Sequence, residues 1–83
     1  MTTVLFFAQL RERLGCERID LELDEPLGFD VFMARLANEL DVDAIRELQA
    51  ENIRIAINQT LLEHPVEVVP GDEIAFLPPV TGG

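Results

Sequence analysis

The spacing of the apolar residues changes along this chain, and that change constrains the fold more than any other feature. A helical period of about 3.6 residues begins at residue 29, and one face collects Phe29, Phe32, Met33, Leu36 and Leu40. On both sides of this segment, apolar residues either run together or alternate with polar ones, as they do in β-strands. The sequence therefore predicts one main helix between strands, in an α+β domain.

Four stretches carry the clearest strand patterns. Residues 3–8 are β-branched and aromatic, residues 17–23 alternate apolar with charged side chains, and residues 53–58 place isoleucine at every second position. A turn at residues 70–72 leads into the last strand, residues 73–77. Because a tight turn cannot join the first and last strands, we expect them to pair in parallel at the centre of the sheet.

Weaker signals predict minor elements around this frame. They are a helical turn at residues 9–15 stopped by Gly15, a short helix capped by Asp41 or Asp43 and ended by Asn52, and brief strands at residues 61–62 and 66–69. Residues 25–28 read as a break, because Pro26 cannot donate a hydrogen bond to a sheet. We expect a mixed sheet of four to five strands, covered by one main helix plus short helices.

The charge balance limits the kinds of partner. Sixteen acidic residues stand against six basic ones, all of them arginines, and the formal net charge is -10. Such a field repels nucleic acid and anionic membranes and attracts basic protein surfaces. A chain of 83 residues also leaves little room for an enclosed active site. We therefore expect a function shared with a protein partner.

Residues that usually carry chemistry are scarce. His64 is the only histidine and Cys16 the only cysteine, which excludes an internal disulfide and any multi-cysteine metal site. We expect no metal site and no bound cofactor, and a reducing, cytoplasmic setting. Charged residues at positions 11–13 interrupt the first apolar run, so it reads neither as a signal peptide nor as a membrane span.

The end of the chain is its most unusual part. Pro78 and Pro79 favour an extended exit from the last strand, and Gly82 and Gly83 have no side chains to block passage through a narrow channel. We predict a globular domain at residues 1–77 and an extended carrier tail at residues 78–83. A terminal carboxylate is an unreactive anion at neutral pH and must be activated before it can carry a group.

Three segments of the sequence are distinctive: Val4-Leu5-Phe6-Phe7-Ala8-Gln9-Leu10-Arg11, Ile57-Asn58-Gln59-Thr60-Leu61 with His64-Pro65, and the segment from Pro70 to Gly83, which ends Pro-Pro-Val-Thr-Gly-Gly. Through these segments the chain resembles the small subunits of molybdopterin synthase over essentially its whole length. The resemblance implies a ubiquitin-like β-grasp fold. It also implies that an E1-like enzyme adenylates Gly83 with ATP, that a sulfur donor protein converts it to a thiocarboxylate, and that Gly82 threads the partner's active site. The large subunit, in a heterotetramer, would hold the catalytic residues and use the sulfur to form the molybdopterin dithiolene.

A partner-binding surface follows from the strand pattern and from this resemblance together. Side chains alternate along a strand, so Phe7 points to the other face of the sheet from the inward Phe6, and Leu77 points to the other face from the inward Phe76. The resemblance adds Leu61 to this surface. The predicted partner-binding residues are these three and the start of the tail: Phe7, Leu61, Leu77, Pro78, Pro79, Val80 and Thr81.

Three other functions stay open on the sequence alone. A sulfur carrier for thiamine synthesis or tRNA thiolation would use the same tail chemistry with other recipients. A ubiquitin-like modifier would join Gly83 to lysines of target proteins. A plain interaction module would not use the tail at all.

Overall fold

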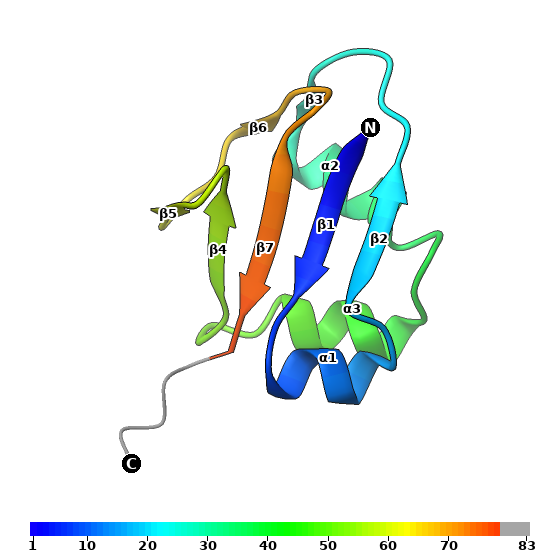
Figure 1. Ribbon diagram of the computed structural model, residues 1–83, viewed down its shortest axis with the longest axis vertical. Coiled ribbons are helices and arrows are strands. Elements are labelled where there is room, and N and C mark those ends of the chain that lie inside the picture. Colours follow the sequence, from blue (N-terminus) through cyan, green and yellow to red (C-terminus); the bar gives the residue numbers. More distant parts are fainter. Residues whose placement is uncertain (79–83) are drawn as a thin grey trace.

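The computed structural model describes residues 1–78, which form a five-stranded mixed sheet, a two-stranded sheet and three helices (Figure 1). The elements are β1 (Thr2–Phe6), α1 (Gln9–Leu14), β2 (Arg18–Leu21), β3 (Leu27–Gly28), α2 (Phe29–Leu36), α3 (Val42–Leu48), β4 (Arg54–Ile57), β5 (Thr60–Leu62), β6 (Glu67–Val68) and β7 (Glu73–Leu77). The large sheet has the strand order β2-β1-β7-β4-β5. No helix in this part of the chain is both long and apolar enough to cross a membrane.

The centre of the sheet is the parallel pair β1 and β7, as predicted. The register pairs Val4 with Ile74 and Phe6 with Phe76, and all four side chains are buried. The rings of Phe6 and Phe76 stack with their centroids 5.8 Å apart. Within residues 1–78 the remaining pairs of the large sheet are antiparallel, so β1 and β7 form its one parallel pair.

Helix α2 covers one face of the large sheet. Its buried residues Phe32, Met33 and Leu36 join the hydrophobic core formed with the central strands. Figure 1 views the sheet from its other face, with α2 behind it and with α1 and α3 near the end where β1 and β7 finish. An ion pair of 2.9 Å between Arg13 and Glu47 links α1 to α3.

Two helices are shorter than the sequence pattern indicates. Helix α2 ends at Leu36, so Leu40, which the period placed on its face, lies beyond it; the chain tightens into turns in which the Asn38 and Glu39 amides donate to carbonyls three residues earlier. Leu40 nevertheless packs against the core. Helix α3 begins after Asp41, whose carboxylate accepts a hydrogen bond from the Ala44 amide at 2.7 Å, and it ends at Leu48, four residues before the predicted stop.

The segment predicted as a break takes part in a second sheet. Strand β3 pairs with β6, Leu27 opposite Val68, and the Phe29 amide donates to the Val66 carbonyl at 2.9 Å. Residues 66–69 thus contain a short strand, as expected, but it lies outside the large sheet. A mixed sheet with two central parallel strands and one main helix across one face is the ubiquitin-like β-grasp arrangement, of the α+β class.

Candidate functional site on the open face of the sheet

The face of the large sheet opposite α2 carries apolar side chains. Since side chains alternate along a strand, the burial of Phe6 and Phe76 against α2 turns Ala75 and Leu77 of β7 to the opposite side, together with Phe7, the residue after β1. Phe7 is 43% exposed and Leu61 of β5 is 62% exposed. Large apolar side chains at this exposure, gathered on one face, are typical of a protein interaction surface.

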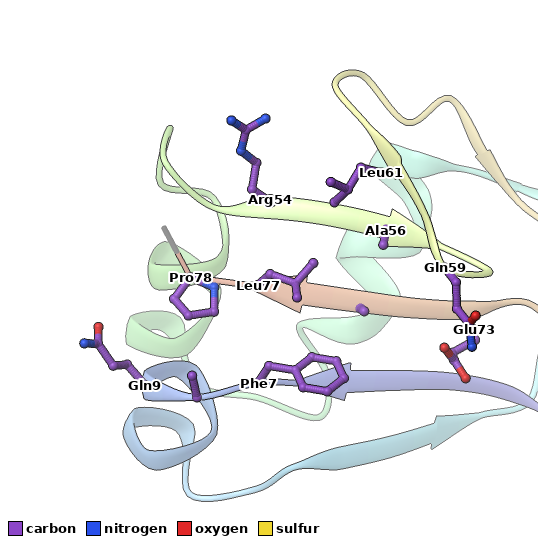
Figure 2. Close-up of a pocket in the computed structure, with 11 residues that line it drawn as sticks. Phe7, Gln9, Arg54, Ala56, Gln59, Leu61, Glu73, Leu77 and Pro78 are labelled. Atoms are coloured by element: carbon purple, nitrogen blue, oxygen red, sulfur yellow. The ribbon is translucent and has the colours of Figure 1, made fainter. Parts of the chain in front are cut away.

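These residues surround a groove of about 960 Å³, which we call the open-face groove (Figure 2). Its lining residues are Phe7, Ala8, Gln9, Arg54, Ala56, Gln59, Leu61, Glu73, Ala75, Leu77 and Pro78. Figure 2 shows Gln9 and Pro78 at one end, where β7 finishes, and Gln59 and Glu73 at the other. The groove therefore runs along the central strands and ends at the root of the tail.

The groove is hollow because its floor is made of alanines. Ala56 of β4 and Ala75 of β7 lie directly opposite each other in the antiparallel register. Leu61 lies opposite Ala56 on the next strand, and Phe7 follows β1 on the other side. Small residues in the middle and large ones at the margins leave a depression that an apolar side chain of a partner can fill.

A tight hairpin places Leu61 at the margin of the groove. Asn58 and Gln59 have φ values of 51° and 69°, the conformation of a two-residue type I′ turn between β4 and β5. The Asn58 side chain accepts a hydrogen bond from the Glu73 amide at 3.0 Å and donates one to Asp72 Oδ1 at 2.9 Å. These bonds tie the hairpin to the start of β7.

Asp72 and Thr2 extend this tie to the first strand. The second carboxylate oxygen of Asp72 accepts a hydrogen bond from the Val69 amide, and the buried Thr2 hydroxyl accepts one from the Gly71 amide. Gly71 has a φ of 93°, which glycine adopts without strain. The turn before β7 is thus fixed to β1 and to the hairpin at once, which holds the far end of the groove in shape.

The predicted site residues fall into two groups. The structure brings Phe7, Leu61, Leu77 and Pro78 together around the groove. The tail residues from Pro79 to Gly83, including Val80, Thr81 and Gly82, lie outside the described residues. Their predicted roles remain predictions.

Sequence reasoning missed the alanine floor and the polar rim. Alternation in residues 53–58 had already placed Arg54 and Ala56 on the outward side, so the signal was present. The outward position of Arg54 and Ala56 marks a site only because β5 and β7 lie on either side of β4, and this arrangement is known only from the strand order.

Other candidate chemistry is sparse in the described part of the chain. Within residues 1–78, no three or more His, Cys, Asp and Glu side chains gather in a way that could hold a metal ion. Cys16 is half-buried against the core, and His64 lies exposed after β5. The open-face groove is therefore the candidate site.

Comparison with known proteins identifies the family of the chain. The model of the ThiS family matches residues 4–83. The molybdopterin synthase sulfur carrier subunits of Haemophilus influenzae and Escherichia coli are 46% and 39% identical to the chain, and each alignment covers all of both proteins. The crystal structure of SAMP1 from Haloferax volcanii superposes with a TM-score of 0.78 at 21% identity, covering 99% of this chain and 98% of that one, and this similarity concerns the fold. The chain therefore belongs to the ThiS family.

Proposed function

We propose that the chain is the sulfur carrier subunit of a molybdopterin synthase and that Gly83 carries the sulfur as a thiocarboxylate. The observation that supports this most strongly is the full-length similarity to two subunits of that name. The apolar groove beside Pro78 supports it as well, because a carrier must dock where its tail emerges.

The tail chemistry requires activation by another protein. The terminal carboxylate, with a pKa of about 3.5, is a poor electrophile. Its attack on the α-phosphorus of ATP, in an E1-like adenylyltransferase, would give an acyl-adenylate and release pyrophosphate. Sulfur at the oxidation level of sulfide, supplied by a donor protein, would then displace AMP and leave the thiocarboxylate. ATP is bound by the activating enzyme, and the carrier itself needs no cofactor.

The open-face groove would receive the large subunit of the synthase. Phe7, Leu61 and Leu77 offer apolar contacts, and the tail that follows Pro78 would enter the partner's active site with Gly82 and Gly83 at its tip. Catalytic residues would then lie in the large subunit, which transfers the sulfur into the molybdopterin dithiolene. Two copies of each subunit would form a heterotetramer.

The first experiment asks whether the terminus is activated. The purified chain is incubated with the E1-like enzyme of the same genome, ATP and a sulfur source, and its intact mass is measured. We expect a mass increase that corresponds to the exchange of one oxygen for one sulfur at Gly83. A chain without Gly83 serves as the control, and an unchanged mass for the full chain would count against the proposal.

The second experiment asks where the sulfur goes. The thiocarboxylated chain is mixed with the large subunit and cyclic pyranopterin monophosphate, and molybdopterin is measured. A yield of molybdopterin supports the proposal, whereas sulfur transfer only to a thiamine precursor or to tRNA would assign the chain to another pathway. Conjugates joined to lysine through Gly83 in cell extracts would identify a modifier instead.

A further inference from the structure

Arg54 differs from the other arginines in its surroundings. Four of them, Arg11, Arg13, Arg18 and Arg46, form ion pairs with carboxylates, and Arg35 donates to the Glu22 carbonyl at 3.0 Å. Among residues 1–78, Arg54 forms neither an ion pair nor a side-chain hydrogen bond. In a chain with sixteen acidic and six basic residues, an arginine without an acidic partner is unexpected.

The position of Arg54 links it to the groove and to the tail. It begins β4 and lies directly opposite Leu77, the last residue of β7, so it stands beside the root of the tail. Arg54 lines the open-face groove and also a smaller depression of about 520 Å³ at the β5 edge, which Glu51 and Glu63 line as well. Figure 2 shows its guanidinium extending outward from β4, at the rim of the groove.

The groove has charges of opposite sign at its two ends. Glu73 begins β7 and Leu77 ends it, so Glu73 and Arg54 are separated by four residues along the strand, about 13 Å. This exceeds the screening length of about 8 Å at physiological ionic strength. The two charges therefore do not neutralise each other. Among the described residues that line the groove, Arg54 at the end beside the tail is the only cation and Glu73 at the far end is the only anion.

We infer that Arg54 is a specificity-determining residue that binds a carboxylate of the partner segment seated in the open-face groove. The inference rests on the proposed function, so the partner is the synthase large subunit. The segment it presents would combine an apolar side chain, seated over Ala56 and Ala75, with an Asp or Glu at the end beside the tail.

The chemistry of the guanidinium suits this role. Arginine presents a planar fork of donors that matches a carboxylate, stays charged at all relevant pH values, and is enriched at protein interfaces. A carboxylate placed at the opposite end would meet Glu73 and be repelled. The pair of charges would thus fix the direction in which the segment lies, and with it the entry of the tail into the partner.

The test measures the affinity of the large subunit for the full-length carrier and three variants, Arg54→Lys, Arg54→Gln and Arg54→Glu. Arg46→Gln is the matched control, because it removes the same charge from an arginine on α3 that does not line the groove. We expect Arg54→Gln to weaken binding about tenfold and Arg54→Glu to weaken it further, with Arg54→Lys between wild type and Arg54→Gln. Raising the salt concentration should narrow the gap between wild type and Arg54→Gln.

Four results would overturn the inference. Equal binding by wild type and Arg54→Gln would remove the role of Arg54 while leaving the proposed function intact. If Arg46→Gln weakened binding of the large subunit as much as Arg54→Gln, the cause would be the change in net charge rather than a specific contact of Arg54. If the effect of Arg54→Gln vanished in a carrier whose terminal carboxylate is converted to an amide, the carboxylate would be the chain's own terminus. Failure of wild type to bind the large subunit would overturn the inference and the proposed docking together.

Discussion

Ala56 of β4 and Ala75 of β7 are direct neighbours in the antiparallel register, and they are 6% and 7% exposed. Their two methyl groups form the floor of the open-face groove. A larger side chain at either position would fill part of the depression. If the depression is where the partner docks, a substitution that fills it should block docking without disturbing the core on the other face of the sheet.

Ala75→Leu tests the importance of the hollow. The leucine side chain would project between Phe7 and Leu61, so we expect the affinity for the large subunit to fall at least about tenfold, while the free energy of unfolding changes by about 1 kcal/mol or less. Titration calorimetry measures the first and urea denaturation the second.

The matched control is Ala34→Leu, which makes the same chemical change at an exposed position of α2, on the opposite side of the domain. It should leave the affinity unchanged. Full affinity in Ala75→Leu would mean that the partner does not use the groove.

Asn58 is expected to stabilise the domain in two separable ways. Asn58→Gly keeps the positive φ of the turn without strain but removes the two side-chain hydrogen bonds, to Asp72 and to the Glu73 amide, and should cost about 1–2 kcal/mol. Asn58→Ala removes the same bonds and adds backbone strain of about 1 kcal/mol. Urea denaturation should therefore rank wild type above the glycine variant and the alanine variant last. An alanine variant as stable as the glycine variant would contradict the contribution of the turn.

The backbone at Ala8 also offers a test. Ala8 has φ 51° and ψ −123°, a region that glycine enters readily and β-branched residues avoid. Relief of strain in Ala8→Gly is offset by the greater flexibility of the unfolded chain, so thermal unfolding should show a stability within about 1 kcal/mol of wild type. Ala8→Val should be clearly less stable than both. Equal stability of the valine and glycine variants would show that this conformation imposes no cost.

Much of the fold could be predicted because its main elements have strong periods. The apolar face that begins with Phe29 and Phe32 predicted helix α2, and the alternating isoleucines of residues 53–57 predicted strand β4. The parallel pairing of β1 and β7 followed from their positions at the two ends of the domain. The β3–β6 sheet could not be predicted, since two-residue strands have no period. The placement of Leu40 on the face of α2 was wrong, because Leu40 reaches the core from the segment after the helix.

The site was predictable only in part, for a different reason. Phe7 and Leu77 were found because each follows an inward phenylalanine in a strand. The alanine floor and the polar ends depend on which strands are neighbours, and an outward alanine in a single strand has no distinguishing pattern. The pairing of β4 with β7 is needed to show that Arg54 and Glu73 line the same groove.

Leu61→Ser separates docking from folding most cleanly. Leu61 is 62% exposed, so its loss should change the free energy of unfolding by only about 0.5 kcal/mol. If the leucine is buried on docking, the same change should weaken binding of the large subunit about tenfold. Val42→Ser is the control, because Val42 is 71% exposed and lies on α3, away from the groove. Equal affinities for the two variants would place the docking surface elsewhere on the domain, whereas a loss confined to Leu61→Ser would locate it on the open face.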